Sequence, residues 1–224
     1  MATSTKYRCA IDIGVINIAF CVIEFTEACD GTFTFELVHM ERATIGDAKE
    51  TIHVLGKKLL SFYSTNDALQ QKKLDYVFIE QQLSRAVKNI VLAYVTIAYF
   101  ETKCLGKDNT TIVFASPKSK FKAVRYAFHE DVLDSINFNC HGRELKKLSV
   151  RIAQVVFKRF GVKVRLDSLI RYKTKLDDVS DVFLQSFVFF LEKFPSKSRG
   201  HQRRLSLFVG IEENGQREDA DEKT

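Results

Sequence analysis

The sequence lacks features that mark several large classes of protein. No apolar run approaches the roughly 20 residues of a membrane-spanning helix, so we expect no membrane partner. Residues 1–7 hold no long apolar stretch of a secretory signal, and they are too short for a persuasive mitochondrial transit peptide. Neither a GxGxxG motif nor a P-loop is present, and the chain has only 10 Gly. A two-domain ATP-binding enzyme of the sugar-kinase class is therefore disfavoured at 224 residues.

The cysteines exclude a disulfide framework and a structural zinc site. Their number is odd and no CxxC pair occurs, which indicates reduced thiols in an intracellular compartment. Cys140 and His141 are adjacent rather than at zinc-finger spacing. The five are Cys9, Cys21, Cys29, Cys104 and Cys140.

Positive charge is concentrated in one part of the chain. Residues 117–175 hold 15 Lys/Arg and 5 Asp/Glu, a net charge of +10 against +6 for the whole sequence. Such a segment indicates a polyanionic partner, which gains affinity through phosphate neutralisation and counterion release. The alternative is a lysine-rich helix face exposed to solvent.

The apolar pattern predicts an α/β domain over residues 1–195. Short apolar segments predict strands, three of them consecutive around an Asp30–Gly31 hairpin signal, and longer periodic segments predict helices. The order β-β-β-α-β-α-β-α-α gives a mixed five-stranded sheet with helices on both faces, as in the RNase H-like fold. The strands are expected at 7–13, 18–25, 32–40, 75–80 and 111–115, and the helices at 47–63, 87–104, 118–160 and 177–194. Residues 196–224 form a basic and then acidic tail, expected to be partly disordered.

Four acids fall where this fold would bring them together. Asp12 lies inside the first apolar strand and Glu80 ends the fourth. Asp178 and Asp181, at i and i+3, open the last helix and project from one face. Converging carboxylates repel one another, and bound cations remove that conflict. Oxygen ligands select hard ions, which predicts two Mg²⁺, replaceable by Mn²⁺, and hydrolysis of a phosphodiester.

Each acid also has a purely structural explanation. Asp12 could be a hydrogen-bonded buried group and Glu80 part of a salt bridge at the strand end. Asp177 or Asp178 could cap the last helix, with Asp177 the preferred cap and not a ligand. Asp181 could simply favour the positive end of that helix. It is the joint arrangement of the four that favours a site.

These residues also carry a family resemblance that spans residues 7–190. The segment Ala10–Phe20 (AIDIGVINIAF) resembles the IDIGxxNxA opening of the RuvC-type Holliday junction resolvases of poxviruses and mitochondria. Residues 77–82 (VFIEQQ) resemble their second motif, and residues 175–181 (KLDDVSD) their last, KKDDxxD. The last motif departs at Leu176 and Ser180, where relatives often have Lys and Ala.

The resemblance implies a metal-dependent endonuclease that cuts four-way DNA junctions, with Asp12, Glu80, Asp178 and Asp181 as metal ligands. It also implies a functional lysine after the fifth strand, best matched by Lys120 and next by Lys118, which could contact the scissile phosphate. A surface lysine is the alternative. The residues expected to contact DNA are Lys118, Lys120, Lys122 and Arg125.

The resemblance further implies a homodimer, because a four-way junction has two strands to cut symmetrically. Residues 87–104 are a candidate interface, although burial in the monomer core is the preferred interpretation. Action at the site of viral DNA replication is expected, and a mitochondrial location is the alternative. The competing functions are another RNase H-like nuclease, acting on RNA–DNA hybrids or flaps, and an inactive DNA-binding relative.

Overall fold

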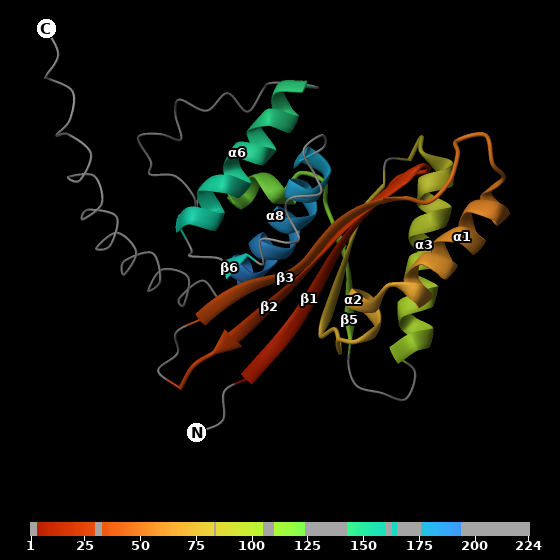
Figure 1. Ribbon diagram of the computed structural model, residues 1–224. Helices are drawn as coiled ribbons and strands as arrows, with labels where there is room; N and C mark the ends of the chain where they lie inside the picture. The colour runs from red at the N-terminus through yellow and green to blue at the C-terminus, as the bar shows by residue number, and fades with distance from the viewer. Residues whose placement is uncertain are drawn as a thin grey trace, which may run out of the picture.

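The structure is a computed structural model in which one sheet carries helices on both sides (Figure 1). The described residues are 4–29, 33–82, 84–104, 110–123, 143–159, 163–164 and 176–193. The predicted tail at 196–224, the Asp30–Gly31 turn and Arg125 lie outside these ranges.

The sheet has the predicted mixed topology. Its first three strands form an antiparallel meander, and β4 and β5 add to it in parallel, in the order β5-β4-β1-β2-β3. A two-residue strand, β6 (Lys163–Val164), extends the sheet beyond β3 and is the one addition to the five strands expected. The five are β1 (Ser4–Ile13), β2 (Asn17–Glu27), β3 (Phe33–Thr44), β4 (Tyr76–Glu80) and β5 (Thr111–Ala115).

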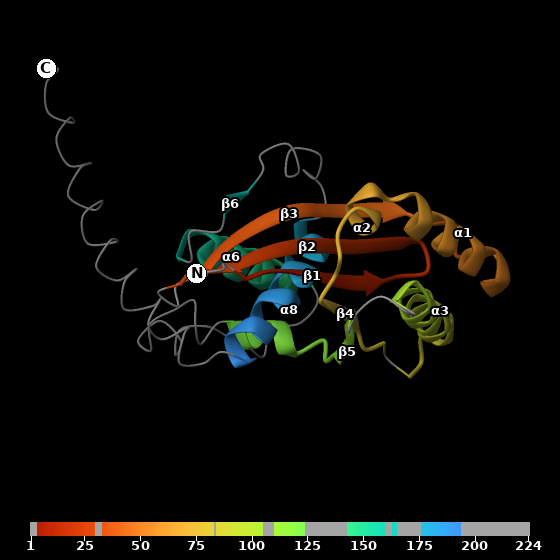
Figure 2. The same cartoon turned by 90° about the horizontal axis from the view of Figure 1, so that it is seen from below.

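Helices cover both faces of the sheet, as expected (Figures 1 and 2). One face packs against α1 (Ile52–Thr65), α2 (Asp67–Gln70) and α3 (Val87–Cys104). The other packs against the 3₁₀ helix η1 (Ser119–Ala123), α6 (Arg143–Arg159) and α8 (Leu176–Lys193). Strand side chains alternate between the two faces, so β1 places Cys9, Ile11 and Ile13 in one core and Ala10 in the other. No described helix is long and apolar enough to cross a membrane.

Three local predictions need correction. The helix expected from residue 47 begins at Ile52, because the Thr51 side chain caps it by accepting from the Val54 backbone N–H. Of the helix expected over 118–160, η1 and α6 are observed, with residues 124–142 outside the described ranges. The apolar residues 111–115 also predict a buried strand, but β5 is an edge strand of the described sheet, and Phe114 is 48% exposed.

Candidate metal-dependent nuclease site

The site is built on one row of residues that crosses the sheet. The β1–β2 register pairs Asp12 with Ala19, and the β2–β3 register pairs Ala19 with Arg42. On the other side of β1, the parallel pairing of Ala10 with Phe78 brings Glu80 beside Asp12 two residues later. Ala10 and Phe78 belong to the core under α8, so Asp12 and Glu80 face α8 as well. The sheet therefore supplies two neighbouring carboxylates to the α8 side.

Helix α8 supplies the other two carboxylates, each paired with a cation. Arg42 Nε donates to Asp178 Oδ2 at 2.8 Å, with side-chain exposures of 19% and 28%. Asp181 is held on both oxygens, by Lys120 Nζ and by Ser149 Oγ. Asp178 thus contacts β3 and Asp181 contacts η1, and the two acids lie one helical turn apart.

Electrostatics show that the four acids share one neighbourhood. Burial, followed by the negative charges of Glu80, Asp181 and Asp178, raises the pKa of Asp12 from 3.8 to about 7, and Lys120 opposes this shift. Burial also raises the pKa of Glu80, and Lys120 opposes that shift. Glu80 Oε2 is buried and has no hydrogen-bond partner. The site is short of positive charge around Asp12 and Glu80.

No protein-family model matches the chain, and no curated protein matches it. Solved structures do. The yeast mitochondrial Holliday junction resolvase Ydc2 superposes with a TM-score of 0.55 at 12% identity, over 90% of this chain and 83% of that one. RuvC from Thermus thermophilus, solved with a Holliday junction substrate, gives 0.50 at 12% identity, over 84% and 96%. The chain has the RuvC-type fold. The RNase H-like architecture expected from the order of strands and helices is thereby confirmed.

Within the RuvC-type fold, the predicted basic residues fall into different environments. Lys120 is only 9% exposed and contacts Asp181, so the surface-lysine alternative is wrong for this residue. Lys118 and Lys122 flank it and are exposed. The predicted DNA contact Arg125 lies outside the described residues.

Asp177 is not the helix cap that the sequence suggested. Helix α8 begins at Leu176, which places Asp177 inside its first turn. Its carboxylate accepts a hydrogen bond from Lys146 of α6, and this partner contributes to a lowered pKa of Asp177. Asp177 therefore pairs with α6, and its exclusion from the ligand set stays a prediction.

Sequence reasoning missed three residues that border the acids: Arg42, Lys146 and Ser149. A signal existed for Ser149, which is a polar residue in the buried stripe of α6 between Leu148 and Ile152. Lys146 and Arg42 carry no such signal. Arg42 reaches Asp178 from 136 positions away in the sequence.

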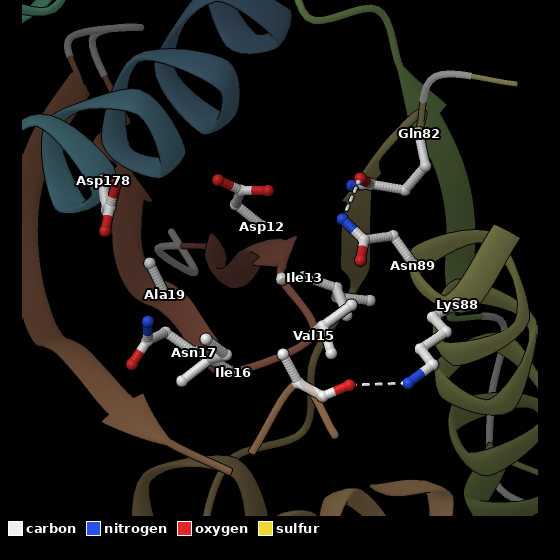
Figure 3. A pocket seen from close by; sticks show the side chains of 12 residues that line it. Asp12, Ile13, Val15, Ile16, Asn17, Ala19, Gln82, Lys88, Asn89 and Asp178 are labelled. Carbon is white, nitrogen blue, oxygen red and sulfur yellow. Dashed lines mark hydrogen bonds between the residues drawn. The ribbon is translucent and has the colours of Figure 1, made fainter. Parts of the chain in front are cut away.

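A pocket of about 630 Å³ opens beside Asp12 and Asp178 (Figure 3). Its floor is the turn between β1 and β2, where the Gly14 N–H donates to Asn17 O at 2.8 Å. A Cβ on Gly14 would lie 2.9 Å from that oxygen, which explains the glycine of the first motif. Across the pocket, Asn89 Nδ2 donates to Gln82 Oε1 at 3.1 Å. The side of the pocket opposite Asp12 and Asp178 therefore carries this amide pair and one cation, Lys88 (Figure 3).

The donor chemistry of the acid cluster suits a hard divalent cation, because every candidate ligand is a carboxylate oxygen. The unpartnered Glu80 Oε2 and the raised pKa of Asp12 are what a cation between them would relieve. Among the described residues, however, no three potential ligands are placed to hold one ion together. Asp178 is paired with Arg42 and Asp181 with Lys120.

Proposed function

We propose that the chain is a structure-selective endonuclease that resolves four-way DNA junctions by divalent-metal-dependent hydrolysis of phosphodiester bonds. The observation that carries the proposal is the convergence of Asp12, Glu80, Asp178 and Asp181 on one face of a RuvC-type sheet. Branched DNA as substrate is supported by the Thermus thermophilus neighbour, whose structure holds a Holliday junction.

The four carboxylates would hold two Mg²⁺, with Mn²⁺ as a substitute. When bound, the ions would activate the attacking water and stabilise charge on the leaving 3′-oxygen. Around them, the chain's own residues set the geometry. Arg42 orients Asp178 through one oxygen, and Ser149 orients Asp181. Lys120 is buried between Asp181 and Glu80, where its charge would stabilise added negative charge on the scissile phosphate.

DNA would approach from the η1 side of the site. Lys118 and Lys122 are exposed on either side of Lys120, so they are placed to contact phosphates of the bound strand. Arg125 would extend this set. Phosphate contacts of this kind position the DNA and leave sequence preference to other groups.

We further propose a homodimer, so that two sites can cut opposite strands of one junction. An apolar face on α3 and β5 supports this assembly. Val87, Tyr94 and Phe114 are 66%, 63% and 48% exposed, and Val91 is 39% exposed. Clusters of exposed apolar side chains commonly mark protein interfaces. Processing of replication or recombination intermediates in a virus-infected cell is the proposed setting, and the mitochondrion is the alternative.

The decisive assay compares cleavage of a synthetic four-way junction, a linear duplex and an RNA–DNA hybrid with Mg²⁺ or Mn²⁺. We expect paired cuts in the junction only. Asp178→Asn should reduce cutting at least about 100-fold, because it removes a ligand that stabilises transition-state charge. Asp177→Asn is the matched control, because the Asp177 carboxylate accepts from Lys146. Its cleavage rate should stay within a few-fold of wild type.

Two outcomes would replace the proposal. Efficient cutting of the hybrid, with the junction neither bound nor cut, would identify another RNase H-like nuclease. Junction binding by wild type and Asp178→Asn alike, with no cleavage under either metal, would identify an inactive DNA-binding relative.

A further inference from the structure

Helix α6 carries a line of basic side chains that the candidate site does not use. Arg143, Lys147, Arg151 and Lys158 are all exposed. Their spacings of four, four and seven residues place them on one side of the helix. We call this set the α6 stripe. The opposite side of α6 is buried, with Ile152, Ala153 and Val156 packed in the core beneath α8.

Within the described part of the chain, no acid is paired with the α6 stripe. The one acidic residue of the helix is Glu144, and among the described residues none of the four basic side chains has an ion-pair partner. Like charges at i and i+4 destabilise a helix by about 0.2–0.5 kcal/mol per pair. Arg143, Lys147 and Arg151 contain two such pairs. A helix face exposed only to solvent would gain from alternating signs, so this pattern favours an anionic partner.

The position of the α6 stripe connects it to the carboxylates. Lys146 and Ser149, on the sides of the same helix, contact Asp177 and Asp181 at the start of α8. Figure 1 shows α6 beside α8, on the side of the sheet opposite α1 and α3. From Arg143 to Lys158 the helix rises about 22 Å at 1.5 Å per residue. That length corresponds to roughly six base pairs of duplex at 3.4 Å each.

We propose that the α6 stripe is a docking surface for the phosphate backbone of a duplex DNA arm that leads away from the cut strand. The inference rests on the proposed function for the identity of the DNA, but not on metal binding. A duplex fits because its phosphates recur along a line at regular intervals, as the side chains do. Arg and Lys contacts to phosphates carry no sequence information, so the α6 stripe adds affinity and orientation.

The test is the salt dependence of DNA binding, measured in EDTA so that no cutting occurs. The variant replaces Arg143, Lys147 and Arg151 with Gln, which keeps helix propensity nearly unchanged. Each lost phosphate contact lowers the slope of log Kd against log salt by about 0.9, so a decrease of about 2–3 is expected for junction and linear duplex alike. Arg151→Gln alone should lower the slope by about 1.

Two controls isolate position from net charge and from packing. Replacing Lys49, Lys57 and Lys58 with Gln removes the same charge from the α1 side of the sheet and should leave the slope near wild type. Arg143→Lys with Arg151→Lys keeps the charge and should also keep the slope. Unfolding temperature then verifies that each variant is folded.

The inference is overturned if the α6 variants keep the wild-type slope, or if the α1-side control lowers it equally. It stands, while the proposed function fails, if wild type shows no preference for the junction but its duplex slope still depends on the α6 stripe. If wild type cleaves the junction but the α6 variants keep the wild-type slope, the proposed function stands and the inference fails.

Discussion

At the scale of single residues, the site combines two poorly neutralised carboxylates with two paired ones. Asp12 and Glu80 lie side by side on the sheet, and burial raises the pKa of both. Asp178 and Asp181 each have a basic partner. The carboxylates of Asp12 and Glu80 therefore repel each other when both are ionised, and a divalent cation would relieve this repulsion.

The repulsion predicts a pH dependence of stability in metal-free protein. The folded-state pKa of Asp12, about 7, lies above its ordinary value of 3.8, so the folded form binds more protons between these limits. Stability is therefore lost as pH rises from about 4 to about 7. In EDTA, Asp12→Asn should become more stable relative to wild type as pH rises. The difference between their unfolding free energies should increase by on the order of 2–4 kcal/mol between pH 4 and pH 8.

Urea unfolding at several pH values measures this gain. The control, Glu101→Gln, removes an exposed acid of α3, and its difference in unfolding free energy from wild type should not increase with pH. A difference between Asp12→Asn and wild type that stays constant with pH would show that Asp12 is not held in its protonated form.

Arg42 is predicted to position Asp178 for metal binding. Arg42 Nε donates to Asp178 Oδ2, and Asp178 lines the pocket beside Asp12 (Figure 3). We expect an ion to bind Asp178 through its other oxygen. Hydrogen-bond partners of metal ligands are worth about 10–100-fold in metal affinity. Arg42→Ala should weaken Mn²⁺ binding by that factor in a titration followed by electron paramagnetic resonance.

Arg42→Lys should recover part of the affinity, and in an Asp178→Asn background the loss of Arg42 should have no further effect. Unchanged or tighter Mn²⁺ binding by Arg42→Ala would indicate that the arginine competes with the metal instead of orienting its ligand.

The sequence predicted the acids more readily than their partners. A carboxylate inside an apolar strand is visible in the sequence, whereas Arg42 becomes a neighbour only through the β2–β3 register and the packing of α8. The signal itself is not specific. A second charged residue of the same strand, Arg8, is also buried, with its guanidinium 4.1 Å from the centre of the Phe25 ring and outside the acid cluster.

At the scale of elements, α3 and β5 share a face on which large apolar side chains are exposed. The sequence predicted a largely buried helix at 87–104, with the monomer core preferred for its aromatic residues. Phe100 is buried as predicted, but Tyr94 is 63% exposed and contacts Phe114, with ring centroids 6.3 Å apart. Apolar periodicity could not separate these cases, because it does not reveal that β5 is an edge strand of the described sheet.

This face predicts the dimer interface. Tyr94→Lys with Phe114→Lys should weaken self-association at least about 100-fold, because each change places a charge where apolar surface would be buried. Sedimentation velocity over a concentration series measures the effect. The control, Val54→Lys with Leu60→Lys, alters two exposed apolar side chains of α1 and should leave the dimer intact. These side chains are 38% and 40% exposed. A monomeric wild type, or a control variant that dissociates equally, would contradict the assignment.

At the scale of the whole molecule, the order of elements in the sequence predicted the sheet and its two helical layers. The meander and the parallel β4 and β5 follow from that order under general rules of chain connection. The pairing of α6 with α8 does not follow from it, because that pairing arises from packing between distant segments. It determines where Lys146, Ser149 and the α6 stripe lie relative to the acids.

The most direct test of the central claim is the anomalous diffraction of crystals soaked in Mn²⁺. We expect strong anomalous peaks about 2.0–2.3 Å from carboxylate oxygens of Asp12 and Glu80, and of at least one of Asp178 and Asp181. Asp181 would then have turned from Lys120, or Asp178 would have kept Arg42 on one oxygen while binding with the other. Fully soaked crystals without a peak among these four residues would contradict the proposed metal-dependent nuclease.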